Sequence, residues 1–106
     1  MNNYLRETSF IIVAMLAFMF SEANEGQDLF KKTCAPCHTI GSGRLVGPDL
    51  KNIGEKRTQD WLIPYIQSSQ TVIKSGDIDA VAVYEEFNSL LMPDQPLDDG
   101  QVVSII

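Results

Sequence analysis

The feature that most limits what this chain can fold into is the pentapeptide Cys34-Ala35-Pro36-Cys37-His38. Its two cysteines are the only cysteines of the sequence, and its histidine is the only histidine. On a helical turn, two thiols three positions apart can each add to one vinyl group of a haem, and the adjacent histidine is then held under the iron. This spacing is the attachment pattern of haem c. The motif therefore predicts one covalently attached haem whose iron is bound by His38.

Two other kinds of site use a Cys-x-x-Cys pair. A thioredoxin-like redox pair requires a βαβ setting, and the chain shows no alternating strand pattern. A structural zinc site requires four ligands, and the sequence offers no further cysteine or histidine. A disulfide between Cys34 and Cys37 would close a very small loop and add little stability. Haem attachment is the interpretation that the motif favours.

The first 23 residues predict a secretory signal peptide. Arg6 supplies a positive charge, Phe10 to Phe20 form an apolar run, and Ser21-Glu22-Ala23 is a small-x-small cleavage site. The alternative is an uncleaved anchor, but this run of eleven residues would span only about 17 Å as a helix, against about 30 Å of hydrocarbon. We expect cleavage after Ala23 and export to the periplasm or the outer face of the cell membrane. No cysteine near the cleavage site offers a point for lipid attachment.

The mature chain, residues 24–106, predicts a single all-α domain with long loops. Helices are expected over residues 25–33, from about Thr58, over residues 78–88, and from Asp98 onward. Asp77 is the expected N-cap of the third helix, and Asp98 with Gln101 has the spacing of a capping box at the last.

Glycine and proline mark the connections between these helices. Residues 41–54 contain four glycines and one proline and predict a loop. Residues 90–97 contain two prolines and are expected to be extended. Pro64 predicts a kink or a late start in the helix near Thr58, because proline lacks the N–H and its ring clashes with the preceding turn.

Met92 is the only methionine that remains after cleavage. A lone methionine is usually a flexible filler of a core. Met92, however, precedes Pro93 in a proline-bounded segment between two predicted helices, from which a thioether can reach the iron face opposite His38. Histidine with methionine is a known axial pair of haem iron and raises its reduction potential. The residues alone leave both roles open.

Over essentially all of its mature length the chain resembles class I c-type cytochromes. The segments that carry the resemblance are Gly26 with Phe30, Cys34-Ala35-Pro36-Cys37-His38, Gly47-Pro48-Asp49-Leu50, Trp61 and Met92-Pro93. The resemblance implies three to five short helices around one covalently bound haem, with Met92 as sixth ligand. It also implies that the Pro48 carbonyl accepts a hydrogen bond from the haem histidine, which fixes the ring.

In the resembled family the last helix continues and crosses the first helix near Gly26 and Phe30. Only about two turns can form here before Ile106, which is marginal for any helix. We therefore expect a shortened C-terminal helix, as in a fragment or in the N-terminal part of a longer protein.

An iron with both axial positions filled can exchange electrons but cannot readily bind substrate. The predicted function is a monohaem carrier of single electrons between respiratory or other redox proteins, and not an enzyme. The alternative is a haem domain or subunit that feeds electrons to an attached or bound oxidoreductase; a gas sensor would require that Met92 leave the iron open. The chain's aromatic residues Trp61, Tyr65, Tyr84 and Phe87 are expected to line the haem pocket and core rather than form an electron pathway.

The expected partners are redox proteins and not nucleic acid, and the mature chain is expected to be a monomer without a membrane span. Its charge is uneven: residues 24–57 carry six basic and four acidic side chains, and residues 58–106 carry one basic and eight acidic. Lys31 and Lys32 adjoin the attachment motif, beside which the haem edge is exposed in the resembled family. We expect this docking face to be less acidic than the whole and to prefer an acidic site on the partner.

Overall fold

The computed structural model describes residues 24–106, and the predicted signal peptide lies outside them. Within this range the chain is helical and has no strand, which confirms the predicted all-α class. An α-helix covers residues 24–29 and continues directly into a π-helical turn, η1. The helical segments, in chain order, are η1 (Phe30–Cys34), α2 (Ile53–Lys56), α3 (Gln59–Gln67), α4 (Ser69–Lys74), α5 (Ile78–Glu86) and α6 (Asp99–Ile105).

Side-chain caps start three helices where the sequence predicts them. Thr58 caps α3 and Asp77 caps α5, each by accepting a hydrogen bond from the backbone N–H three residues further on. Asp98 and Gln101 form a reciprocal capping box at α6. Each bond satisfies a backbone group that a helix end otherwise leaves unpaired, so the start of each helix is fixed locally.

Other boundaries differ from the sequence prediction. Of the two alternatives that Pro64 predicted, a kink or a late start, the late start does not occur: α3 begins at Gln59 and continues through Pro64. The N–H that Pro64 lacks would have bonded the Asp60 carbonyl, which lies in the exposed first turn, where water can satisfy it. α5 ends at Glu86 rather than at Asn88, because Asn88 adopts a left-handed φ of 58°.

The short helices α2 and α4 lie where no helix was predicted. Ile53 and Gly54 belong to α2, although they were predicted to be part of the loop of residues 41–54. α4 has only six residues and packs against both α3 and α5. A helix of this length is unstable alone, so its neighbours rather than its own sequence stabilise it.

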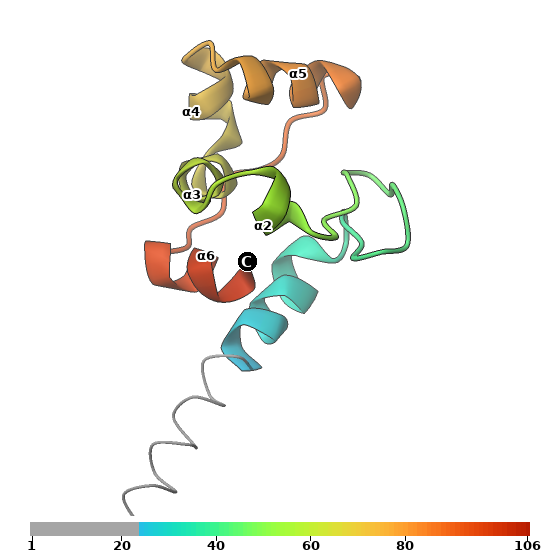
Figure 1. Cartoon of the computed structure of the whole chain (residues 1–106), viewed down its shortest axis with the longest axis vertical. Coiled ribbons are helices and arrows are strands. Elements are labelled where there is room, and N and C mark those ends of the chain that lie inside the picture. Colours follow the sequence, from blue (N-terminus) through green and yellow to red (C-terminus); the bar gives the residue numbers. More distant parts are fainter. Residues whose placement is uncertain (1–23) are drawn as a thin grey trace, which may run out of the picture.

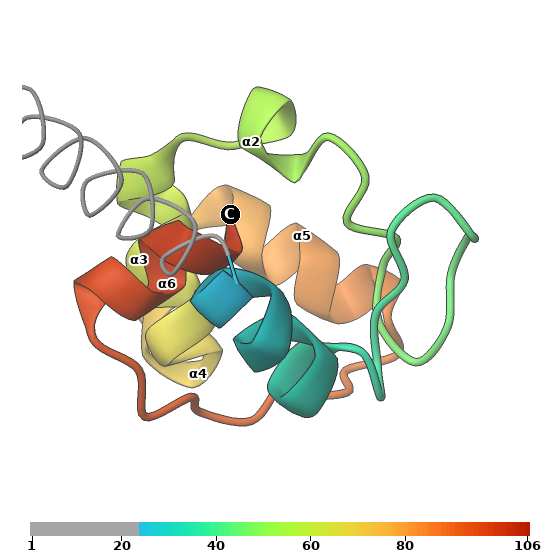
Figure 2. The same ribbon diagram turned by 90° about the horizontal axis from the view of Figure 1, so that it is seen from below.

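The first helix and α6 cross at close range beneath α3, as Figures 1 and 2 both show. Gly26 is buried at the crossing, and a Cβ there would lie 2.6 Å from the carbonyl carbon of Ser104. Only glycine permits this approach. The resemblance implied that the last helix crosses the first one. α6, which ends at Ile105, makes this crossing.

Few apolar side chains are fully buried against one another. Within residues 24–106 the buried hydrophobic residues are Cys34, Leu62, Ala80 and Val102. Most of the larger apolar side chains instead surround a cavity between the helices. The fold is thus a helical shell around a site rather than a filled core.

Candidate functional site

A cavity of about 850 Å³ lies between the first helix, the loop of residues 38–52 and helices α2–α6. Sites for cofactors and other small molecules typically measure about 300–1,000 Å³ and are mostly apolar. Each helical segment contributes an apolar side chain to the lining, namely Phe30, Ile53, Leu62, Ile73, Val83 and Ile105. The cavity therefore has the size and chemistry of a site for a large apolar group.

Three of the four predicted site residues line this cavity. Cys37, His38 and Met92 are at its wall, and Cys34 is buried in η1, three positions before Cys37. Both cysteines are free thiols. Residues from opposite ends of the chain are thus brought to one site, His38 from the turn after η1 and Met92 from the segment between α5 and α6.

The four aromatic residues Trp61, Tyr65, Tyr84 and Phe87 also line the cavity, which confirms that they pack around it. The rings of Trp61 and Tyr65 stack with centroids 4.6 Å apart. Trp61 Nε1 donates a hydrogen bond to Asp77 Oδ1 at 3.1 Å, so the α5 cap also holds the indole. Burial of Tyr65 raises the pKa of its hydroxyl, so the ring stays uncharged.

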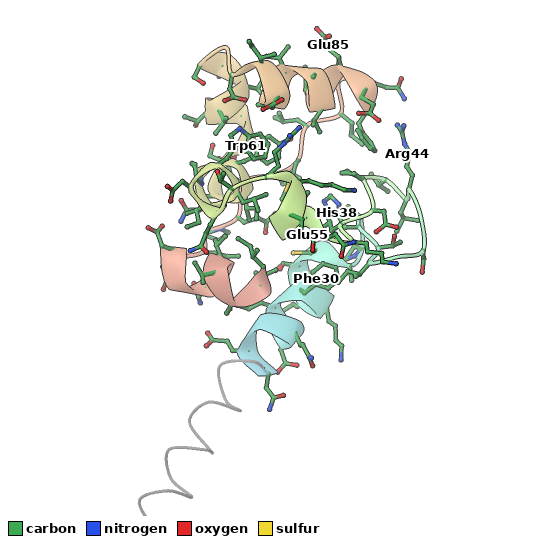
Figure 3. The ribbon with its side chains drawn as sticks, in the orientation of Figure 1. Phe30, His38, Arg44, Glu55, Trp61 and Glu85 are labelled. Atoms are coloured by element: carbon green, nitrogen blue, oxygen red, sulfur yellow. The ribbon has the colours of Figure 1, made fainter. Side chains whose placement is uncertain are left out.

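His38 is held by its own backbone and by the following loop. Its ring Nδ1 lies 2.9 Å from the Pro48 carbonyl oxygen, and its backbone N–H donates to the Cys34 carbonyl at 2.9 Å. Because a carbonyl can only accept, Nδ1 carries the proton and the lone pair of Nε2 is left for a metal. The contact that the resemblance implied for Pro48 is confirmed. Figure 3 shows His38 between η1 and the helices above it.

Gly47 packs its backbone directly against the His38 ring. A Cβ at this position would lie 2.5 Å from Cε1 and 2.8 Å from Nδ1, both too close for a real contact. Its N–H donates to the Cys37 carbonyl at 2.7 Å, which keeps the backbone in place. Sequence analysis identified Gly47 only as part of a motif, since the contact depends on how the loop folds back.

Asp49 organises the loop that carries Pro48. Its Oδ1 accepts hydrogen bonds from the N–H groups of Gly41 (2.8 Å) and Lys51 (2.9 Å), and its Oδ2 accepts one from Gly43 (2.9 Å). Gly41 and Gly43 both have φ near +90°, a conformation that favours glycine. These hydrogen bonds from backbone N–H groups, of which the one from Gly41 has the largest effect, lower the pKa of the Asp49 carboxyl. The role of Asp49 was not predicted.

Ser69 is a second residue that sequence analysis missed. Its side chain is fully buried at the start of α4, and its Oγ donates to the Met92 carbonyl at 2.8 Å. A single serine carries no local signal that it binds the Met92 backbone, because its partner lies 23 residues away.

The residues at the cavity fit an iron porphyrin. An imidazole with a free Nε2 and a thioether are a known axial pair, two thiols adjoin the imidazole, and the remaining lining is largely apolar. Among residues 24–106 no cluster of three or more His, Cys, Asp or Glu side chains could hold a bare metal ion. None of the helices in this range is long and apolar enough to cross a membrane.

Comparison with known proteins supports this assignment. The family model for cytochrome c matches residues 23–105. A cytochrome c-553-like protein from Synechocystis is 30% identical over 59 residues, which are 56% of each chain. A cytochrome c from Cochliobolus lunatus is 38% identical over 45 residues, 41% of this chain and 42% of that protein. The chain thus spans about half the length of these relatives.

Solved structures share the fold. Cytochrome c from Rhodothermus marinus has a TM-score of 0.70 at 22% identity and covers 80% of this chain and 71% of that one. The cytochrome c domain of the pp3183 protein from Pseudomonas putida has a TM-score of 0.65 at 27% identity, with 76% and 79% covered.

A helical shell around a largely apolar cavity, with a Cys-x-x-Cys-His motif beside it, defines a haem-binding protein. More particularly, the chain belongs to the cytochrome c family, and its cofactor is covalently bound haem c.

Proposed function

We propose that this protein carries single electrons between redox proteins, with its haem joined to Cys34 and Cys37 and its iron bound by His38 and Met92. One observation carries the proposal: His38, its Nε2 left free by the bond to Pro48, and Met92 line the same cavity from separate segments. It is a carrier and not an enzyme in this proposal, because two protein ligands leave no position for substrate.

The chain's own residues would set the conditions for electron transfer. Haem supplies an iron that cycles between the ferric and ferrous states. The Pro48 carbonyl fixes the His38 ring and raises its basicity, and the Met92 thioether favours a high reduction potential. The largely apolar lining would limit the access of water to the iron. Fixed ligands keep the rearrangement between the two oxidation states small, as repeated electron exchange requires.

We also propose export with cleavage after Ala23. The cytochrome c family model begins to match at residue 23, so the apolar N-terminal run lies outside the family domain. The domain is then residues 24–106, acting as a monomer in the periplasm or at the outer face of the membrane, with redox proteins as partners.

A second candidate is a haem domain or subunit that passes electrons to an attached or bound oxidoreductase. The similarity to the Pseudomonas putida cytochrome c domain favours it, since that domain is described as part of a larger protein. An oxidoreductase that co-purifies with the protein expressed from its own promoter would distinguish this function from a free carrier.

The ligand assignment is tested in the haem-loaded protein with Met92→Ala. The ferric wild type should show the weak far-red band of sulfur-to-iron charge transfer. The variant should lose the band, have a lower reduction potential and bind carbon monoxide when ferrous, because the sixth position is then open.

Val103→Ala is the matched control, because it truncates an exposed apolar residue of α6 that does not line the cavity and should leave the band in place. A Met92→Ala protein with an unchanged spectrum would refute the ligand assignment. Carbon monoxide binding by the wild type would instead favour a gas sensor.

A further inference from the structure

The segment of residues 90–98 carries Met92 with no regular secondary structure to hold it. Two of its residues are prolines, which have no backbone N–H to donate. Within the segment, Leu97 N–H donates to the Gln95 carbonyl at 2.8 Å, and Gln95 Nε2 donates to the Pro93 carbonyl at 3.1 Å. Neither bond includes Met92, so its position depends on contacts with another element.

That element is the corner between α3 and α4, residues 67–69. Ser69 Oγ donates to the Met92 carbonyl at 2.8 Å. On the other side of Pro93, Gln95 N–H donates to the Gln67 carbonyl at 3.1 Å, and Gln67 Nε2 donates to the Leu97 carbonyl at 3.1 Å. The corner therefore binds the segment at Met92 and again at Gln95 and Leu97.

Burial makes the bond from Ser69 difficult to replace. Ser69 is 0% exposed, so water does not compete for its hydroxyl. If Met92 moved away, the hydroxyl would lose its partner in a dry environment, which costs more than the loss of a solvated hydrogen bond. The corner is itself part of the cavity wall, since Ile66 of α3 and Ile73 of α4 both line the cavity. The bond thus fixes Met92 relative to the site.

We infer that Ser69 is a positioning residue for the sixth iron ligand, and that Gln67 is the second anchor of the same segment. Ser69 does not touch the iron; it acts by holding the Met92 backbone, so that the thioether remains at the iron in competition with external ligands. This inference rests on the proposed ligation by Met92.

The test is Ser69→Ala in the haem-loaded protein, measured at a temperature well below unfolding. Without the hydroxyl the segment opens more readily, so the far-red band of the ferric form should weaken. The association constant of the ferrous form for carbon monoxide should rise about tenfold, the effect of one lost hydrogen bond. Gln67→Ala, at a less buried position, should act in the same direction.

Two variants separate positioning from general stability. Ser69→Thr keeps the hydroxyl and should restore the band. Ser75→Ala removes an exposed hydroxyl that donates to the Val72 carbonyl in its own turn, and it should change neither readout.

Ser69→Ala and Gln67→Ala proteins with the wild-type band and carbon monoxide affinity would overturn the inference, even if their melting temperatures fell. A wild type that lacks the band would overturn the Met92 assignment, and this inference with it.

Discussion

At the scale of single residues, Gly47→Ala should disturb His38, the proposed iron ligand, while every proposed ligand stays in the chain. The added Cβ would lie 2.8 Å from Nδ1, and the backbone cannot retreat because Gly47 N–H is bonded to the Cys37 carbonyl. The imidazole must therefore shift and weaken its bond to Pro48. Overpacking of this kind costs about 1–3 kcal/mol of unfolding free energy. Denaturant unfolding of the ferric protein, followed by haem absorption, measures the loss.

Gly54→Ala is the control for this prediction, because a Cβ at Gly54 would meet only Ile106 Cγ2 at an ordinary 3.7 Å. Alanine is also the better helix former within α2, so this variant should be as stable as the wild type or slightly more stable. Equal stability of the two alanine variants would contradict a steric role for Gly47.

The residues that the sequence predicted and those that it did not differ in whether a known motif assigns them a role. The attachment motif, Pro48 and Met92 could be identified because each belongs to a short motif with a characteristic order. The roles of Ser69 and of the contact between Gly47 and His38 could not be identified, because no motif or residue type assigns them. A lone serine or a glycine before proline is typical of many ordinary turns.

At the scale of elements, the loop that holds Pro48 should loosen in acid because Asp49 organises it. Three backbone N–H groups lower the pKa of this carboxyl below its usual 3.8, so its contribution to stability is present above that pH. The contribution is lost as the pH falls through the lowered pKa of the folded state. Unfolding free energy measured from pH 6 to pH 2 should therefore fall less steeply in Asp49→Asn than in the wild type.

Asp94→Asn provides the matched control, because it removes an equal charge from a carboxylate with no hydrogen-bond partner in the described part of the chain. Asp77 contributes in the same direction, since the Ala80 N–H and the Trp61 indole lower its pKa, so both variants will still lose stability in acid. If Asp49→Asn and Asp94→Asn follow the same curve, the loop does not depend on the Asp49 charge.

The three helices that begin at a side-chain cap were predictable, whereas α4, which has no such cap, was not. The first helix, expected over residues 25–33, was predicted from its apolar pattern without a cap. α3, α5 and α6 begin at Thr58, Asp77 and Asp98, where a side chain satisfies the first turn. α4 has no side-chain cap bond and forms between α3 and α5, which a sequence pattern does not show. The π-helical turn η1 is of the same kind: Ala35 N–H reaches the Phe30 carbonyl five residues back. Thr33 Oγ1 donates to the Leu29 carbonyl in the same turn.

At the scale of the whole molecule, the fold depends on its cofactor more than on contacts between side chains. Small domains bury little apolar surface and commonly need a disulfide, a metal or a cofactor to be stable. Here the two cysteines form no disulfide, and many of the larger apolar residues face the cavity. The attachment motif predicted the haem, and the resemblance to class I c-type cytochromes implied short helices around it.

The last prediction concerns the uneven charge of the molecule. Lys31 and Lys32 are exposed on η1, beside the attachment motif. The acidic residues Asp79, Glu85 and Glu86 are on α5, which lies at the top of Figure 1. Charges further apart than about 10 Å are largely screened at 0.1 M salt, so a reagent that approaches near the motif experiences the lysines and not the net charge of the chain. The face near Lys31 and Lys32 should therefore attract anions although the protein is acidic.

Ferricyanide, an anionic oxidant, should consequently react more slowly with the ferrous Lys31→Glu or Lys32→Glu protein than with the wild type, and salt should reduce the difference. Lys74→Glu makes the same charge change at the end of α4, in the acidic half of the sequence, and should have a smaller effect. The cationic oxidant tris(1,10-phenanthroline)cobalt(III), whose potential is high enough to oxidise a His/Met haem, should show the opposite order. If all three variants slow ferricyanide equally, the rate follows net charge and neither lysine lies where electrons leave. If only the Lys31→Glu and Lys32→Glu variants react more slowly with ferricyanide, the natural partner should present an acidic surface to this face.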